Sequence, residues 1–181
     1  MAPNLFVRQF TKLPYPEISF KEQTVIITGS NTGLGFEAAR HFARLGASKV
    51  ILAVRSISRG EEAVKSINTS TGTNVCEVWH VNMGDFKSIT DFCKRAEGLN
   101  RLDVVCQNAG IAKGEFTQME GMESTIAVNV VGTFLMALNL LPTLRRSGIK
   151  TGHVPRLVNT SSEVYESVSF QMAVFDSYLS F

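Results

Sequence analysis

The amino-acid sequence predicts one α/β domain built around a mainly parallel sheet. Short β-branched runs alternate with longer stretches whose apolar residues recur at helical spacing, and this alternation is typical of βαβ units. The chain has 181 residues, which is close to the length of one ordinary domain. Its 44% of apolar and 19% of charged residues exclude a disordered, collagen-like or coiled-coil chain.

Five runs are expected to form strands, and helices are expected between them. Thr24–Thr28 and residues 49–54 are apolar at most positions, as a strand covered on both faces requires. The first helix starts from Gly35 and stops at Gly46, a residue type suited to the position after a helix end. The other strands are expected at 74–81, 102–106 and 156–160, and the other helices at 60–67, 88–97 and 121–144.

The charge and the cysteine content exclude several classes of protein. A formal net charge of +2 gives no reason to expect a nucleic-acid partner, which usually leaves a strongly basic patch. The three cysteines, Cys76, Cys93 and Cys106, are too few and too scattered for a disulfide framework or a zinc site. We therefore expect no bound metal and a reducing compartment, the cytoplasm.

The sequence shows no membrane segment and no secretory signal. A span needs about 20 consecutive apolar residues, and the best candidate, residues 125–141, is interrupted by Asn129 and Asn139. Residues 1–20 are interpreted as an extended arm lying on the domain. Because Arg8 and Lys12 precede the first acidic residue, a transit peptide is the alternative.

The strongest local signal is a glycine-rich turn between the first strand and the first helix, Thr28-Gly-Ser-Asn-Thr-Gly-Leu-Gly35. Glycines allow a tight turn and a close approach of the backbone to a pyrophosphate. The following helix N-terminus offers free N–H groups and a positive dipole end to the phosphates. The turn therefore predicts nucleotide binding, with these candidate contacts: Gly29, Asn31, Thr32, Gly33, Leu34 and Gly35.

The end of the second strand indicates which dinucleotide is bound. An acidic residue about 20 positions after the glycines would bind the ribose 2′-hydroxyl of NAD. Arg55 occupies that position here, and a guanidinium attracts a 2′-phosphate that a carboxylate would repel. The sequence thus favours NADP(H), the alternative being that Arg55 is an ordinary solvated charge at a strand end.

Several motifs in this order resemble the short-chain dehydrogenase/reductase family. The turn of residues 28–35 is similar to the family's TGxxxGxG loop, and Gln107-Asn-Ala-Gly110 to its NNAG motif, with Gln in place of the first Asn. Asn129 falls at the family's helix asparagine, and Ser162, at the end of the fifth strand, at its catalytic serine. The resemblance covers the run from Thr24 to Ser162.

The resemblance implies a Rossmann-type, doubly wound sheet in the order 3-2-1-4-5, with an NADP-binding domain at 21–162 and an irregular tail at 163–181. It also implies that Asn82 stands where the family usually has an adenine-contacting Asp. The helix at 121–144 would pack in homo-oligomers, or against a full-length relative. Further implied cofactor contacts are Met83, Asn108, Ala109 and Gly110.

The family's catalytic Tyr-x-x-x-Lys pair has no match in this sequence. A phenol, with an ordinary pKa of about 10, needs the nearby ammonium to work as an acid–base group near neutral pH. The last lysine is Lys150, Tyr165 is only three residues past Ser162, and Tyr178 has only three residues after it. The sheet is therefore expected to be incomplete relative to the family, its fifth strand an exposed edge, and the chain a shortened product of a longer reductase gene.

The resulting hypothesis is an NADP(H)-dependent dehydrogenase/reductase for a carbonyl or secondary alcohol of a small organic molecule, in a biosynthetic pathway. Ser162 and Asn129 are its candidate catalytic residues. The alternatives are a non-catalytic module that binds the cofactor or pairs with another subunit, and a non-redox reaction on the same scaffold. The sequence leaves the substrate, the direction of reaction and the oligomeric state open.

Overall fold

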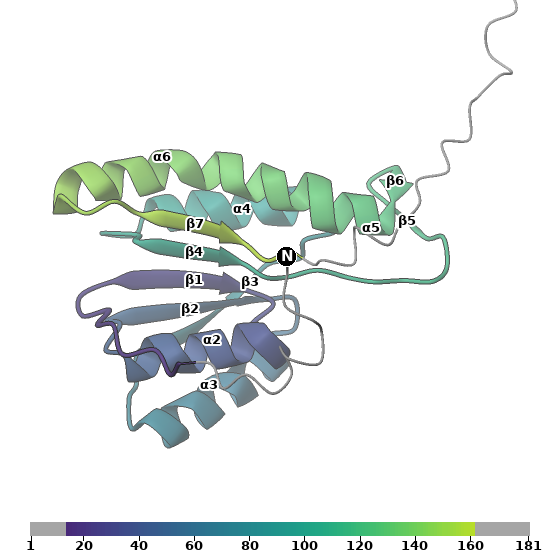
Figure 1. Ribbon diagram of the computed structural model, residues 1–181. Coiled ribbons are helices and arrows are strands. Elements are labelled where there is room, and N and C mark those ends of the chain that lie inside the picture. Colours follow the sequence, from purple (N-terminus) through teal and green to yellow (C-terminus); the bar gives the residue numbers. More distant parts are fainter. Residues whose placement is uncertain (1–13, 162–181) are drawn as a thin grey trace, which may run out of the picture.

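The computed structural model describes residues 14–161, which contain a five-stranded parallel sheet (Figure 1). Its strands lie in the order β3-β2-β1-β4-β7, which confirms the predicted order 3-2-1-4-5. β1 is therefore central, paired with β2 on one side and β4 on the other. The strand bounds are β1 Thr24–Thr28, β2 Lys49–Val54, β3 Cys76–His80, β4 Val104–Gln107 and β7 Arg156–Asn159.

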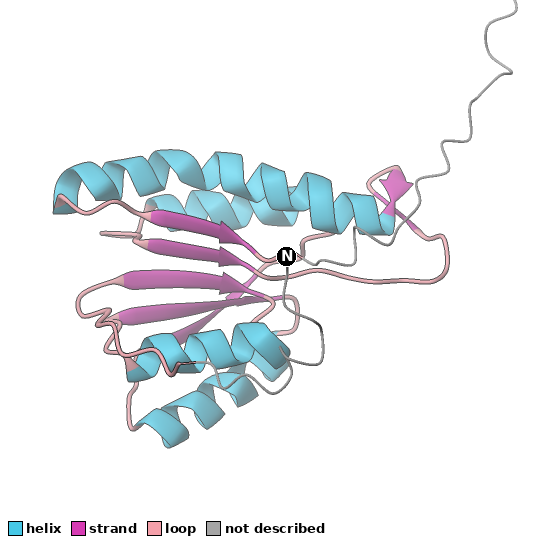
Figure 2. Ribbon diagram, viewed as in Figure 1, coloured by secondary structure: helices cyan, strands magenta, loops and turns pink. Residues whose placement is uncertain are grey.

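Helices cover both faces of the sheet (Figure 2). α2 (Gly33–Arg44) and α3 (Ile57–Thr71) lie on one face, and α4 (Phe86–Glu97) and α6 (Thr133–Thr151) lie on the other. Alternate residues of β1 point to opposite layers, because Val25 and Ile27 belong to the α2/α3 core while Ile26 belongs to the α4/α6 core. All three are fully buried, which explains why the sequence of β1 is a continuous apolar run.

The helix predicted at 121–144 starts and ends at other residues in the structure. Residues 118–123 form a hairpin of β5 (Gln118–Met119) and β6 (Met122–Glu123), joined by Glu120 and Gly121 with positive φ values of 52° and 76°. Two positive φ angles are the mark of a tight hairpin turn. The helix itself begins at Ser124 and continues to Thr151, where Gly152 (φ 69°) ends it.

The remaining elements differ from the expected bounds only at their ends. α3 begins three residues before Gly60 and continues to Thr71, because its first and last turns carry no repeated apolar positions that would reveal them. α4 begins two residues earlier than expected. Asp85 caps its N-terminus, because the Asp85 side chain accepts a hydrogen bond from the Ser88 N–H. β3 is shorter than residues 74–81.

The segment before β1 contacts α2. The Arg44 guanidinium donates a hydrogen bond to the Pro16 carbonyl oxygen at 2.7 Å and lies 4.3 Å from the centre of the Tyr15 ring. The Phe20 ring meets the Phe42 ring edge-on at 4.6 Å. These contacts hold residues 15–20 against the α2/α3 layer.

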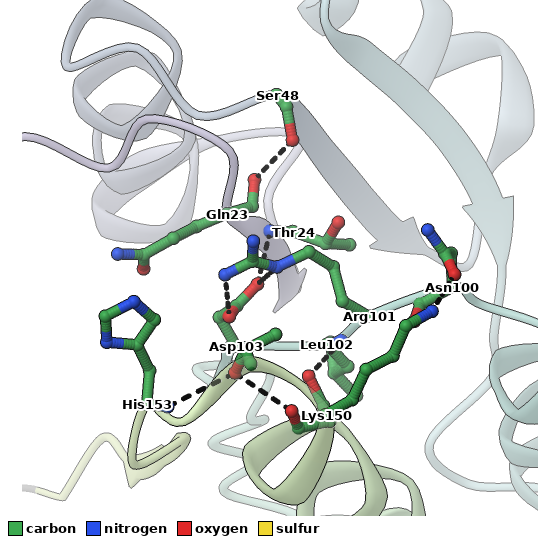
Figure 3. A network of polar contacts seen from close by, with 11 residues as sticks. Gln23, Thr24, Ser48, Asn100, Arg101, Leu102, Asp103, Lys150 and His153 are labelled. Atoms are coloured by element: carbon green, nitrogen blue, oxygen red, sulfur yellow. Dashed lines mark hydrogen bonds and ion pairs between the residues drawn. The ribbon is translucent and has the colours of Figure 1, made fainter.

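A polar network closes the amino-terminal end of the sheet (Figure 3). The Asp103 carboxylate, 6% exposed, accepts two hydrogen bonds from the Arg101 guanidinium at 2.6 and 2.8 Å and one from the Thr24 N–H at 2.8 Å. The Asp103 carbonyl oxygen accepts from the Arg156 N–H at 2.8 Å. One residue thus ties together the starts of β1, β4 and β7.

The continuous helix Ser124–Thr151 is long and apolar enough to cross a membrane by those two measures alone. Its inward face instead belongs to the core of the domain, where Met136, Leu140 and Leu144 are buried with residues of α4 and the sheet. The long apolar stretch is therefore explained by a helix that packs on one sheet face.

Candidate nucleotide-binding cleft

A cleft of about 410 Å³ lies where the carboxyl ends of β1, β2 and β4 meet. Ligands of open parallel sheets bind at this end, where the strand order reverses on either side of β1. The lining residues come from the glycine-rich turn, the ends of β2, β3 and β4, and the hairpin region. They are Gly29, Asn31, Thr32, Ala53, Val54, Arg55, Val81, Asn82, Met83, Gly84, Asn108, Ala109, Gly110, Ile111, Lys113, Met119 and Val128.

Two positions of the turn require glycine, because a side chain there would overlap neighbouring atoms. A Cβ on Gly29 would lie 2.9 Å from the Ala109 Cα, and Gly29 also has a positive φ of 66°. A Cβ on Gly35 would lie 2.5 Å from the Asn108 Nδ2 and 2.8 Å from the Gly29 carbonyl oxygen. The turn is therefore pressed against the end of β4, and side chains at these two positions would force the two apart.

Hydrogen bonds between β1 and β4 fix the same contact. The Thr28 Oγ1, fully buried, accepts from the backbone N–H of Asn108 at 3.0 Å and of Ala109 at 2.9 Å. The Asn108 Nδ2 donates to the carbonyl oxygens of Thr28 and Gly29 at 3.1 and 3.3 Å. Asn108 and Ala109, which the sequence predicts as cofactor contacts, hold the turn in its shape.

The N-terminus of α2 meets the cleft at Thr32. Thr32 precedes the helix with extended backbone, its side chain forms no capping hydrogen bond, and the first turn carries no acidic residue. The N–H groups of this turn, at Gly33, Leu34 and Gly35, are thus not neutralised by a carboxylate, and the helix dipole adds positive potential. The Leu34 side chain is 77% exposed and does not line the cleft, so only its backbone can serve a ligand.

The charge of the cleft wall is entirely positive. Arg55 directly follows β2 and is exposed, and Lys113 lies on the loop after β4, where its Nζ donates to the Thr117 Oγ1 at 3.1 Å. None of the lining residues is an Asp or a Glu. A polyanionic ligand would therefore meet cations and N–H groups without a repelling carboxylate.

Asn82 and Met83 form a turn between β3 and α4. The Asn82 Oδ1 accepts from the Gly84 N–H at 3.1 Å, and the Asn82 carbonyl oxygen accepts from the Asp85 N–H at 3.1 Å. The Asn82 N–H donates to the Ser88 Oγ at 3.0 Å. The turn is thus held at three points, and Asn82 is presented to the cleft beside the end of β2.

Asn129 does not line the cleft but shapes its rim. It lies in a π-helical segment, η1 (Ala127–Gly132), between α5 (Ser124–Ile126) and α6. Its Oδ1 accepts from the Ile111 N–H at 2.9 Å, and its Nδ2 donates to the Ile111 carbonyl oxygen at 2.8 Å. The amide therefore fixes the loop after β4, so that Gly110 and Ile111 stay at the cleft.

Sequence reasoning missed the hairpin and the lysine of this site. The Met119 sulfur packs against Gly84, whose Cβ, if present, would lie 2.5 Å from it. Phe86 N–H donates to the Glu120 carboxylate at 2.9 Å, which anchors the hairpin on α4. Glu120-Gly121 could have been read as a two-residue turn, whereas no pattern singles out Lys113.

Ser162, predicted as a catalytic residue, lies outside the described residues, and so do Tyr165 and Tyr178. Of the predicted cofactor contacts, nine line the cleft, and Gly33, Leu34 and Gly35 form the first turn of α2 beside it. Within residues 14–161, no group of three or more His, Cys, Asp or Glu side chains is placed to hold a metal ion.

The sheet, the glycine-rich turn and the cleft define a Rossmann-type dinucleotide-binding fold. A profile of the short chain dehydrogenase family matches residues 23–177. Similar curated proteins include a short chain dehydrogenase, atnD, of Emericella nidulans, 48% identical, with 91% of this chain and 54% of the relative covered. Another is the short chain dehydrogenase FGM9 of Gibberella zeae, 46% identical, with 90% of this chain and 48% of the relative covered.

A similar solved structure is a short chain dehydrogenase from Escherichia coli CFT073 in complex with NADPH. It is 29% identical with a TM-score of 0.67, and 85% of this chain and 65% of that chain are covered. The chain described here belongs to the short chain dehydrogenase family, whose members bind nicotinamide cofactors. It spans about half the length of the curated relatives it matches.

Proposed function

We propose that this chain binds NADP(H) and acts as an NADP(H)-dependent dehydrogenase or reductase. The observation that carries the proposal is the charge of the cleft, in which Arg55 follows β2 and no lining residue is a carboxylate. NADP(H) carries a 2′-phosphate in addition to its pyrophosphate, so its binding gains more from such a wall than the binding of NAD(H) does. The similar NADPH complex from Escherichia coli supports the same choice.

The described residues fit the parts of this cofactor. The N–H groups of the glycine-rich turn and of the α2 N-terminus would hold the pyrophosphate. The Arg55 guanidinium would pair with the 2′-phosphate, and residues 108–111, held by Thr28 and Asn129, would contact the nicotinamide half. The bound cofactor supplies the hydride, while this part of the chain binds and orients it.

The proposed reaction transfers a hydride between the nicotinamide and a carbonyl or secondary alcohol carbon of a small organic molecule in a biosynthetic pathway. Asn129 acts in this scheme as a positioning residue, because its amide bonds fix Ile111 at the cleft. Ser162 would orient the substrate oxygen. The three cysteines, Cys76, Cys93 and Cys106, are free, in keeping with a reducing compartment such as the cytoplasm.

Calorimetric titration with NADPH and NADH tests the cofactor proposal. We expect saturable binding that favours NADPH, and Arg55→Asp should reduce the NADPH-to-NADH affinity ratio at least tenfold, because repulsion replaces a charge-assisted contact. The matched control is Lys94→Asp, which makes the same charge change on the exposed side of α4. An affinity ratio that Arg55→Asp leaves unchanged would refute the assignment.

A second candidate function, a module that pairs with another subunit without catalysing a reaction, is favoured by one exposed stripe. The stripe consists of four apolar side chains at four-residue steps along the continuous helix, which places them on one helix face. They are Ile126, Val130, Phe134 and Leu138, exposed by 47%, 43%, 57% and 64%. We propose that a second chain carrying the same helix, this protein or a full-length relative, covers the stripe.

Sedimentation of the purified chain tests the pairing. Phe134→Glu should convert a dimer into a monomer, since it places a charge in the middle of the stripe. Ile57→Glu is the control, because Ile57 is 40% exposed at the start of α3, on the opposite face of the sheet. A chain that is monomeric at every concentration, and that does not change the activity of a full-length relative, would exclude this candidate.

A further inference from the structure

We propose that Glu120 is a positioning residue for the bound cofactor, because its carboxylate holds the β5–β6 hairpin against α4 and so keeps Met119 in the wall of the cleft. The inference rests on the proposed binding of NADP(H) and concerns how long the cofactor stays bound. It is carried by three observations: the backbone of Glu120, the hydrogen bond that its side chain accepts, and the packing of Met119.

The backbone at Glu120 has a conformation that glycine adopts more readily. Its φ of 52° lies in the left-handed region, where a side chain crowds the backbone, and the next residue of the turn, Gly121, has a φ of 76°. Glycine fits both central positions of such a hairpin turn. A non-glycine residue in this conformation indicates that its side chain makes a contact that outweighs the cost.

The Glu120 side chain makes that contact at the N-terminus of α4. Its carboxylate accepts a hydrogen bond from the Phe86 N–H at 2.9 Å, across 34 positions of the chain. The positive end of the helix dipole also attracts a carboxylate at this place. Among residues 14–161, this is the only hydrogen bond that joins the hairpin, residues 118–123, to α4. The Glu120 carboxylate therefore attaches the hairpin turn to the helix.

Met119, the neighbour of Glu120, forms part of the cleft wall. Its sulfur fills the space beside Gly84, where a Cβ would lie 2.5 Å from the Met119 Sδ and 3.4 Å from the Val128 Cγ2. All three of these residues line the cleft. The wall at this point is thus supplied by the hairpin, and it is held in place only as firmly as the hairpin is.

The base of the hairpin is held without Glu120. The Ser124 N–H donates to the Thr117 carbonyl oxygen at 2.7 Å, and the hydroxyl oxygens of these two residues lie 2.6 Å apart. Ser124 is fully buried. Loss of the Glu120 contact should therefore release the turn and Met119 without unfolding the segment, and a bound cofactor should then leave more easily.

Two variants at position 120, compared by NADPH titration, test the inference. Glu120→Gly removes the carboxylate and suits the positive φ, so the turn is kept while the contact with α4 is lost. We expect NADPH to bind about fivefold more weakly, through faster dissociation measured by stopped-flow fluorescence. Glu120→Gln keeps an oxygen that can accept from the Phe86 N–H and should restore most of the affinity.

The charge of Glu120 by itself predicts the opposite result. Both substitutions remove a negative charge near a cleft that would bind a polyanion, which on that ground alone should tighten binding. Glu115→Gly is the matched control, because it makes the same charge change in the exposed loop before the hairpin and removes no hydrogen bond to α4. A Glu120→Gly variant that binds NADPH as tightly as this control overturns the inference.

A double-mutant cycle shows whether Glu120 acts through Met119. In the Met119→Ala background, Glu120→Gly should not change NADPH dissociation further, because the side chain that the contact positions is absent. Additive effects of the two substitutions overturn the inference while the NADP(H) proposal stands. Equal affinities of the unmodified chain for NADPH and NADH refute the cofactor preference alone, and failure of both cofactors to bind overturns both proposals.

Discussion

The two ends of the β1–β4 strand pair use their polar groups in opposite ways. At the amino end, the Asp103 carboxylate is buried and bonded to the Arg101 guanidinium and the Thr24 N–H (Figure 3). At the carboxyl end, Arg55 after the neighbouring strand β2 is exposed, and the first turn of α2 carries no acidic residue. The first end stabilises the sheet, and the second leaves donors and cations for a ligand.

The difference teaches how one pair of strands serves both stability and binding. Strand ends carry backbone groups that the sheet itself cannot satisfy, and these must find partners in side chains, water or ligands. The starts of β1, β4 and β7 find theirs in Asp103. At the other end Thr28 and Asn108 satisfy only the groups needed to hold the glycine-rich turn.

Breaking the amino end should have the largest effect on stability. Asp103→Asn leaves the Arg101 guanidinium, whose side chain is only 19% exposed, without its carboxylate. We expect a loss of about 3 kcal/mol in the free energy of unfolding, measured by urea denaturation, because a largely buried charge loses its partner. Lys87→Ala, which breaks the exposed pair with Asp91, should leave stability unchanged. Equal effects of the two substitutions would contradict the comparison.

At the carboxyl end, Gly29→Ala should affect binding more than stability. The substitution combines a positive φ with an overlap against the Ala109 backbone, for an expected loss of about 2 kcal/mol, and it should abolish NADPH binding because the turn must move. Gly33→Ala is the matched control, since Gly33 has a similar φ of 62° but open space around its Cβ. If Gly33→Ala lowers NADPH affinity as strongly as Gly29→Ala, the close contact with β4 is not what shapes the site.

The smallest effect concerns the start of the long helix. Hydrogen bonds from the N–H groups of Thr125 and Ile126 lower the pKa of the Glu123 carboxyl. The contact therefore contributes its full stability at pH values above the ordinary glutamate pKa. This contribution is lost as the pH falls through the lowered pKa of Glu123. We expect Glu123→Gln to lower the thermal midpoint slightly at pH 7 and not at pH 3. A difference that persists at pH 3 would show that charge is not the cause.

Much of this architecture could be predicted from the sequence. The apolar runs at β1 and β2 and the glycine-rich turn are local patterns, and each follows from backbone chemistry over a few residues. The alternation of strands and helices, with right-handed crossovers, restricts the possible topologies to few. Nine of the twelve predicted cofactor contacts line the cleft for the same reason, because residues that follow parallel strands meet at one edge.

The features that were missed depend on contacts between distant segments. Glu120 takes its positive φ beside α4, where its carboxylate accepts from Phe86, and the helix start moves to Ser124 as a result. Asn129 was read as part of a catalytic motif, and only the fold shows that its amide holds the backbone of Ile111, 18 positions away. No local pattern encodes such pairs.

By itself the sequence determined the glycine-rich turn and the cation after β2, since these depend on neighbouring residues, and the sheet order came from its resemblance to the family. Only the tertiary structure decided which polar groups are satisfied internally and which are left for a ligand. Asn82 illustrates this, because its amide could form hydrogen bonds through either end, and the fold satisfies its Oδ1 with the Gly84 N–H.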